Sequence, residues 1–306
     1  MIQSLSHPPT PLEQLASPKE GVQLFIKRDD LLHPKEDIHF CGNKWRKLKY
    51  NLLQAKEEGH TKLLTFGGAY SNHIAAVASA GQLFGFETIG IIRGEAHPVL
   101  NPTLQHAKAM SMELQYWNRS DYRQKNSPEA LAQLKKSFGE FYLLPEGGTN
   151  LLALKGVEEL ITELQTQLPI DEQTFIAVSC GTGGTMAGLI RGLQGKGQVI
   201  GFPALKGDFM QDEVRHWLGT EAKVLTKWSM QNTYHFGGYA KYKPDLLHFL
   251  GFFHAEYGIS LDPIYTGKLC FGVLDLLKKG FFSPGSKVVM VHTGGLQGMA
   301  GFKERL

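Results

Sequence analysis

Lys44 stands directly behind a Gly-Asn pair, in the stretch HFCGNKWRKLKYNLLQAKEEG that covers residues 39–59. A lysine becomes a nucleophile toward a carbonyl group when burial or nearby positive charge lowers its pKa from the ordinary value of about 10.4. Arg46 and Lys47 follow closely and could supply that charge. Most lysines on helices are solvated surface residues, so Lys44 becomes a candidate only if another part of the chain supplies a partner site.

The segment SCGTGGTMAG, residues 179–188, has the pattern of an anion-binding turn. A β-branched run leads into glycines and then into a helix, so free backbone N–H groups and the positive helix end would surround an anion. The hydroxyls of Thr182 and Thr185 favour a phosphate cradle over a plain glycine-rich connection. The spacings of the P-loop and of the dinucleotide-binding fingerprint are both absent, so we expect the phosphate of something other than ATP or NAD.

A reactive lysine and a separate phosphate cradle are together what a pyridoxal-phosphate enzyme requires. The aldehyde of that cofactor needs an amine held at a fixed distance from its phosphate. The two motifs therefore predict this class of cofactor.

The elements that must position these motifs alternate along the chain. Short β-branched runs predict buried strands at residues 22–28, 62–68, 87–94, 174–181, 198–204 and 286–295. Helical patterns lie between them, over residues 44–58, 71–84, 102–112, 127–138, 150–167 and 183–193. This alternation predicts an α/β fold with mostly parallel sheet.

Glycines gather at four predicted strand ends, in FGGAYSNH, LPEGGTN, VSCGTGG and VHTGG. In open parallel sheets, ligands bind beyond the carboxyl ends of the strands. We therefore expect the four turns to point to one edge and to form a common site.

The composition restricts the classes of function. With 42% hydrophobic and 20% charged residues and a net charge of +3, the chain has no basic excess that would suggest nucleic acid as a partner. No apolar run is long enough for a membrane span, and no signal peptide is evident. Cys41, Cys180 and Cys270 lack paired spacing, which argues against a disulfide framework or a metal site and favours a cytoplasmic location.

Five motifs, FCGNKWRKLKYNL, FGGAYSNH, SCGTGGTMAG, LDPIYTGK and VHTGG, resemble in this order the family of D-cysteine desulfhydrase and 1-aminocyclopropane-1-carboxylate (ACC) deaminase. The resemblance covers nearly the whole chain. It implies pyridoxal 5'-phosphate as cofactor and an α/β fold of type II, with two open, twisted, mostly parallel sheets flanked by helices and the cofactor in the cleft between domains. It also implies a large cofactor-binding domain (1–48 and 145–306), a small domain (49–144), a small amino-acid substrate and a homodimer.

The resemblance further assigns roles to individual residues. Lys44 would bond covalently to the cofactor, and Lys47 would help to hold its phosphate. Ser71 and Asn72 would lie at the cofactor oxygen and the substrate carboxylate. His73 stands where the family usually has glutamine, next to this pair, and is a further predicted substrate-binding residue.

Two tyrosines, Tyr239 and Tyr265, would lie near the cofactor ring and the substrate. With Lys44 and Ser71 they form the predicted catalytic set. The predicted cofactor-binding set comprises Lys44, Lys47, Asn72, Cys180, Gly181, Thr182, Gly183, Gly184, Thr185, Thr266 and Thr293.

Thr266 and Thr293 distinguish two activities of the family. Ring-opening enzymes have glutamate after the tyrosine and leucine before the last glycine pair, whereas desulfhydrases have hydroxyl residues there. A hydroxyl at the pyridine nitrogen leaves the ring a weaker electron sink than a carboxylate would, which suffices when a thiolate leaves from the β-carbon. We therefore predict β-elimination from D-cysteine, or a similar small amino acid, to pyruvate, ammonia and sulfide. The alternatives are ACC deaminase, which gives 2-oxobutanoate and ammonia, and a cofactor-binding protein without turnover.

Overall fold

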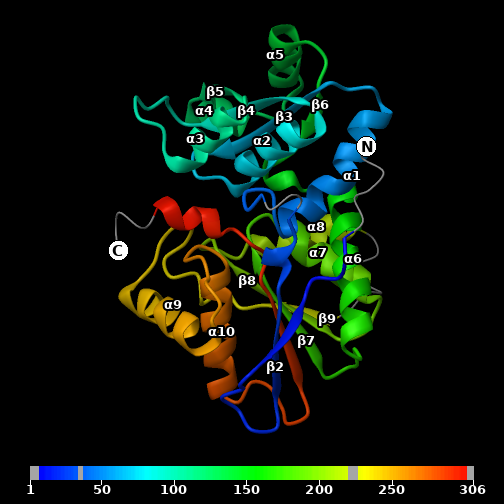
Figure 1. Cartoon of the computed structure of the whole chain (residues 1–306), viewed down its shortest axis with the longest axis vertical. Coiled ribbons are helices and arrows are strands. Elements are labelled where there is room, and N and C mark those ends of the chain that lie inside the picture. Colours follow the sequence, from blue (N-terminus) through cyan, green and yellow to red (C-terminus); the bar gives the residue numbers. More distant parts are fainter. Residues whose placement is uncertain (1–6, 34–36, 220–226, 302–306) are drawn as a thin grey trace.

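The computed structural model describes residues 7–33, 37–219 and 227–301. Its strands form two sheets, which Figure 1 shows one above the other. No helix in these ranges is both long and apolar enough to cross a membrane.

The larger sheet has the strand order β1-β2-β10-β7-β8-β9, and only β1 runs antiparallel to its neighbour. Helices α6, α7 and α8 cover one face, while α9 and α10 cover the other. Val288 and Val289 enter opposite apolar clusters, so both faces of the sheet are buried and its strands carry no polar stripe. The bounds are β1 (Leu12–Leu15), β2 (Gln23–Lys27), α6 (Leu151–Gln167), β7 (Thr174–Cys180), α7 (Gly184–Leu193), β8 (Gln198–Pro203), α8 (Met210–Leu218), β9 (Lys227–Met230), α9 (Pro244–Tyr257), α10 (Thr266–Lys278) and β10 (Lys287–Val291).

The smaller sheet has the order β5-β4-β3-β6, and all its strands are parallel. Helices α1, α2 and α3 pack on one face and α4 and α5 on the other. The bounds are α1 (Asn43–Glu57), β3 (Lys62–Gly68), α2 (Asn72–Phe84), β4 (Glu87–Arg93), α3 (Pro102–Ala109), β5 (Glu113–Trp117), α4 (Arg119–Arg123), α5 (Pro128–Phe138) and β6 (Tyr142–Leu144), with 3-10 turns η1 (Asp29–Leu31), η3 (Glu146–Gly148) and η5 (Leu296–Gly301). Two mostly parallel sheets flanked by helices confirm the predicted fold class.

The four glycine-bearing turns do not share one edge of one sheet, contrary to the simplest expectation. Two follow β3 and β6 of the smaller sheet, and two follow β7 and β10 of the larger one. They nevertheless meet: a Cβ on Gly147 would lie 2.8 Å from Thr182, and one on Gly295 would lie 2.8 Å from the Asn72 amide. The common site therefore lies where the carboxyl ends of the two sheets face each other.

The predicted elements agree with the structure except in three respects. Helix α3 ends at Ala109 rather than at residue 112, because Ser111 has a φ of 63° and turns the chain into β5. Three short strands, β1, β5 and β9, were not predicted. Neither were helices α4, α8, α9 and α10, although α10 proves to be central to the site.

Candidate active site

Helix α1 begins at the site because Gly42 allows a backbone conformation that few other residues adopt. Gly42 has a φ of 57°, and a Cβ there would overlap the carbonyl oxygen of Thr293. The same carbonyl accepts the N–H of Asn43 at 3.2 Å. The glycine of the Gly-Asn-Lys motif thus lets α1 start against the turn after β10, with Lys44 in its first turn.

Burial lowers the pKa of Lys44 from 10.5 to about 8. The side chain is only partly exposed, and removal of the ammonium from water disfavours its charged form. Burial, and not the charge that we expected from Arg46 and Lys47, lowers the pKa of Lys44. Arg46 is neutralised by two carboxylates. Lys47 in turn has a pKa far below the ordinary value, because it is buried and lies near Lys44.

The neutral amine of Lys44 should therefore be present at lower pH than for an ordinary lysine. Trace acetylation of the apo-protein, followed by peptide mass spectrometry, is expected to give a reactivity midpoint for Lys44 near pH 8. N-acetyl-lysine amide in the same tube provides the internal standard, with a midpoint of about 10.4. Equal midpoints for Lys44 and the standard would show that burial does not activate this amine.

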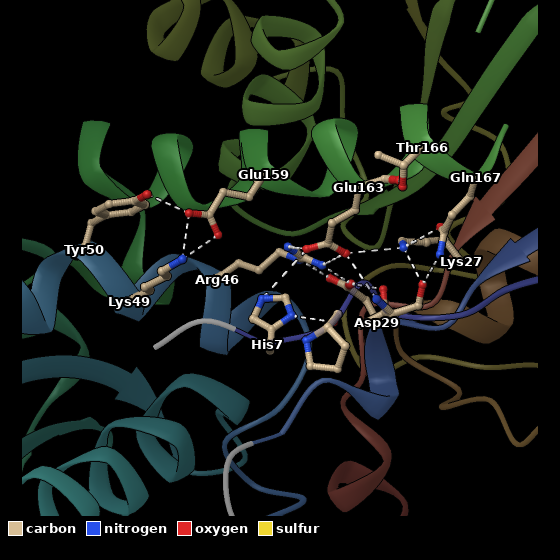
Figure 2. A network of polar contacts seen from close by, with 12 residues as sticks. His7, Lys27, Asp29, Arg46, Lys49, Tyr50, Glu159, Glu163, Thr166 and Gln167 are labelled. Atoms are coloured by element: carbon tan, nitrogen blue, oxygen red, sulfur yellow. Dashed lines mark hydrogen bonds and ion pairs between the residues drawn. The ribbon is translucent and has the colours of Figure 1, made fainter. Parts of the chain in front are cut away.

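Arg46 belongs to a buried network that joins α1 to α6 (Figure 2). Its Nε and Nη2 donate to the two oxygens of Asp29 at 2.7 and 2.6 Å, and its Nη1 and Nη2 donate to Glu163 at 2.8 and 3.0 Å. Lys27 lies 3.3 Å from Glu163 and completes a set of two cations and two anions. A Cβ on Gly156 of α6 would overlap the carbonyl oxygen of Arg46, so the two helices cross in direct contact. The network fixes the helix that carries Lys44.

The loop after β7 has the donors that a phosphate group needs. The N-terminus of α7 has no side-chain cap, whereas α2 to α6 are each capped by a side chain. Lys47 donates to Thr149 Oγ1 at 2.9 Å, which lies 2.6 Å from Thr182 Oγ1. A Cβ on Gly184 would overlap Thr149, so this close approach requires glycine. Free amides, hydroxyls and an ammonium at one helix end fit the phosphate of the expected cofactor.

The other loop residues differ in what they contact: Thr185 and Gly181 face other parts of the site, whereas the Cys180 thiol lies in the core. Thr185 Oγ1 accepts the Asn43 amide at 3.2 Å, which ties the loop to the start of α1. A Cβ on Gly181 would lie 3.2 Å from the ring of Tyr265. The Cys180 thiol packs 3.6 Å from the sulfur of Met186 in the core, and burial raises its pKa to about 12. Its place in the cofactor-binding set stays a prediction.

Ser71, Asn72 and His73 form the first turn of α2. The Ser71 hydroxyl accepts the N–H of Ile74 as the helix cap and retains its own proton to donate. The Asn72 amide faces the turn after β10 at Gly295. His73 is buried, and its Nε2 lies 2.9 Å from the Thr65 hydroxyl. Burial and the two nearby lysines hold the pKa of His73 well below 6.5, so its ring is neutral.

Tyr265 and Thr266 stand at the start of α10, where Asp262 organises the turn. The Asp262 carboxylate accepts the N–H groups of Tyr265 and Thr266 at 2.7 and 2.9 Å. The Thr266 hydroxyl donates to Asp262 at 2.6 Å and accepts the Asp262 N–H at 2.9 Å. Because this proton is already used and the side chain is fully buried, Thr266 supports the helix start and has no free donor for a cofactor.

Thr293 differs from Thr266 in this respect. Its carbonyl is engaged with α1, but its hydroxyl has no hydrogen-bond partner among the described residues. The side chain is 6% exposed and follows β10 directly. Of the two threonines, Thr293 is the one with a free donor, and its carbonyl binds the N–H of Asn43, the residue before Lys44.

Tyr239 lies in the loop between β9 and α9 and faces Tyr265. The two ring centroids are 6.2 Å apart at an interplanar angle of 65°. Burial raises the pKa of both tyrosines above 10.0, so both remain protonated near neutral pH. The two predicted aromatic residues are therefore brought together by the fold.

Three residues of the site were missed from the sequence. Thr149 follows a glycine pair in a turn that was noticed, so its position at a strand end was the available signal. Asp262 and Lys268 are the second and the last residue of the motif LDPIYTGK, in which only the tyrosine and the threonine were assigned roles. Asp262 precedes a proline, which is typical of a helix start.

Comparison with known proteins agrees with this geometry. Residues 3–294 match a family described as "Pyridoxal-phosphate dependent enzyme". A bifunctional D-cysteine desulfhydrase/1-aminocyclopropane-1-carboxylate deaminase of Arabidopsis thaliana, described as mitochondrial, is 31% identical over 320 residues, 97% of this chain and 78% of that protein. A D-cysteine desulfhydrase of Klebsiella pneumoniae is 26% identical over 318 residues, 97% of this chain and 95% of that one. A crystal structure described as an ACC deaminase homologue matches with a TM-score of 0.81 and 28% identity, over 98% of this chain and 93% of that chain. This chain belongs to the family of pyridoxal-phosphate-dependent enzymes.

Proposed function

We propose that this enzyme catalyses β-elimination from D-cysteine, or a similar small amino acid, to pyruvate, ammonia and sulfide. The observation that carries the proposal is the threonine pair. Thr293, whose carbonyl binds the N–H of Asn43 just before Lys44, offers a neutral hydroxyl. Thr266 occupies the place of the glutamate of ring-opening relatives while its own proton is donated to Asp262.

Pyridoxal phosphate, when bound, supplies an aldehyde that bonds the substrate amine and a ring that accepts the electrons of the Cα–H bond. Lys47 and the Thr182–Thr185 loop would hold its phosphate, and the Thr293 hydroxyl would be the donor for its pyridine nitrogen. The amine of Lys44, with a pKa of about 8, takes the α-proton at Nζ. Ser71 and Asn72, at the N-terminus of α2, bind the substrate carboxylate, since hydroxyl, amide and helix dipole all favour an anion there.

Tyr239 and Tyr265 act as proton donors rather than as bases in this scheme. Burial raises the pKa of each phenol, so the protonated form dominates at neutral pH. The pair donates a proton to the sulfur that leaves the β-carbon. The remaining enamine takes up one water and breaks down to pyruvate and ammonia.

The decisive experiment measures products from three substrates. Sulfide and pyruvate are assayed with D-cysteine and L-cysteine, and 2-oxobutanoate and ammonia with ACC. We expect turnover of one cysteine enantiomer and little or no ring opening. Efficient ring opening with no reaction of either cysteine would establish the second candidate, ACC deaminase, which the names of the relatives also support. A bound cofactor that turns over none of the three would favour a silent binding protein.

The Thr293→Val variant tests the role of the free hydroxyl. Loss of a hydrogen bond to a buried acceptor costs about 1–3 kcal/mol, so we expect elimination to slow by about 5- to 150-fold. Thr293→Ser keeps the hydroxyl and serves as the matched control, with activity near that of the wild type. A valine variant as active as the serine variant would place another donor at the ring nitrogen.

Thr266 is less suited to such a test. A glutamate there would bring a second carboxylate against Asp262 in a fully buried position. We expect Thr266→Glu to disrupt the start of α10, because two like charges at that distance repel.

We also propose a homodimer in the cytoplasm, with a large domain of residues 1–48 and 145–306 and a small domain of residues 49–144. All strands of the smaller sheet fall within the proposed small domain, which supports the division. The three cysteines are free and buried, which is compatible with a reducing compartment. Light scattering of the purified holoenzyme tests the dimer, and a monomeric mass at micromolar concentration would refute it.

A further inference from the structure

One face of α10 is occupied by the loop of residues 234–241, which carries Tyr239. The face is formed by residues at the spacing i, i+3, i+4 and i+7, which lie on one side of a helix. Its members are Lys268, Phe271, Gly272 and Asp275.

Three of the four residues hold the start of the loop. Asp275 accepts the Tyr234 hydroxyl at 2.7 Å. Phe271 packs edge-on against the ring of Phe236, with centroids 4.9 Å apart. A Cβ on Gly272 would lie 2.9 Å from the ring of Tyr234, so glycine lets that ring lie directly on the helix.

Lys268 holds the part of the loop nearest to Tyr239. Its ammonium donates to the carbonyl oxygens of His235 and Gly238 at 2.9 and 2.8 Å, and to that of Ala204 at 3.5 Å. The side chain is 1% exposed, and all three acceptors are backbone carbonyls. Asp262 contributes favourable charge, but burial dominates and lowers the pKa of Lys268 to about 8.

The loop adopts a backbone conformation that needs such support. Phe236, Gly237, Gly238 and Ala240 have φ angles of 54°, 99°, 118° and 54°. Positive φ is costly for residues with a Cβ, and two of the four have one. Tyr239 lies within this run and is 39% exposed.

The position of Lys268 is itself unfavourable. A cation in the first turn of a helix opposes the helix dipole, and an ammonium out of water is destabilised further. A lysine at this site would therefore lower the stability of the protein if its ammonium did not bind the loop carbonyls. The result of these contacts is the placement of Tyr239 edge-on against Tyr265, with ring centroids 6.2 Å apart.

We propose that Lys268 is a positioning residue for Tyr239: its ammonium holds the carbonyls of His235 and Gly238 and thereby keeps the Tyr239 phenol against Tyr265. The inference rests on the proposed function only in assigning Tyr239 to the reaction. The contacts to the loop are independent of which substrate is used.

The test uses the holoenzyme labelled with tyrosine carrying 13C at Cζ. Tyr239→Phe identifies the Tyr239 resonance among the 10 tyrosines. In Lys268→Met, which keeps the length but has no donor, we expect this resonance to shift and its titration midpoint to fall toward about 10. Lys278→Met, on the exposed last turn of the same helix, is the matched control and should leave the resonance unchanged.

Kinetics of the same variants provide the second readout. Lys268→Met is expected to lower kcat by about 10²-fold with a smaller change in KM, because misplacement of a catalytic group affects the reaction step. In protein that already carries Tyr239→Phe, the additional change Lys268→Met should lower kcat only slightly further. If Lys268→Met does not fold, Lys268→Gln replaces it in both the NMR and the kinetic measurement. Glutamine keeps two N–H donors, so we expect smaller effects in the same direction.

The outcomes separate this inference from the proposed function. The positioning role would be overturned if the Tyr239 resonance were unchanged in Lys268→Met. It would also be overturned if the double variant lost kcat by the product of the two single losses, because the two residues would then act independently. Failure of every substrate would overturn the proposed function alone, since the resonance of Tyr239 still reports on Lys268.

Discussion

Lys44→Ala is expected to abolish turnover and the covalent link to the cofactor. On the proposed mechanism, the variant loses the amine that bonds the aldehyde and the group that takes the α-proton. General base catalysis alone contributes about 10²–10⁴-fold, so we expect kcat to fall by about 10³-fold or more. Borohydride reduction followed by peptide mass spectrometry should label Lys44 in the wild type and no lysine in the variant.

Lys49→Ala is the matched control for this experiment. Lys49 lies on the same helix, but its ammonium binds Glu159 of α6 at 2.7 Å, outside the site (Figure 2). Its loss should leave turnover and labelling at Lys44 unchanged. If Lys44→Ala keeps its visible cofactor band and a reducible lysine adduct, the covalent role belongs to another lysine.

Arg46→Met is expected to cause the largest loss of stability. Removal of the guanidinium leaves the fully buried carboxylate of Asp29 without its main partner, and leaves Glu163 with Lys27, His7 and the N–H of Thr10. Breaking a buried ion pair in this way costs about 3–5 kcal/mol of unfolding free energy. Urea denaturation measures the loss, and Arg46→Lys should recover only part of it, since an ammonium cannot bind two carboxylates in the bidentate manner of arginine.

Lys49→Met again provides the comparison, because it removes a partly exposed ion pair from the same helix. Such pairs contribute about 1 kcal/mol or less. Equal losses for Arg46→Met and Lys49→Met would show that the buried network does not stabilise the fold. Covalent labelling at Lys44 should also slow in Arg46→Met, since the network positions the start of α1.

The same network predicts a dependence of stability on pH. Burial alone would raise the pKa of Glu163, but the hydrogen bonds and charge of Arg46 outweigh burial and lower it below 4.5. A carboxylate with a lowered pKa contributes stability above its unfolded pKa, and that stability is lost as pH falls through the folded pKa. Wild-type protein should therefore lose stability from this group below about pH 4.5, and Arg46→Met should show a smaller loss over the same range.

Much of the fold could be predicted because its elements have local patterns. Helix α1 shows apolar residues at three- and four-residue steps, and Gly59, with a φ of 75°, follows its end as expected. Helix α10 could not be predicted in this way. Most of its 13 residues are buried, so its sequence TGKLCFGVLDLLK has no polar stripe, and its glycines disfavour a helix in isolation.

The sequence by itself determined which groups could do the chemistry: a lysine behind Gly-Asn, a phosphate loop, two tyrosines and two threonines. Only the tertiary structure decided how each is used. Thr266 gives its proton to Asp262 whereas Thr293 keeps its own, and Arg46 is neutralised by Asp29 and Glu163, which lie 17 and 117 positions away in the chain. The physical reason is that sequence patterns report local conformation and burial. The charge of a buried group and the saturation of its hydrogen bonds depend instead on partners that only folding brings together.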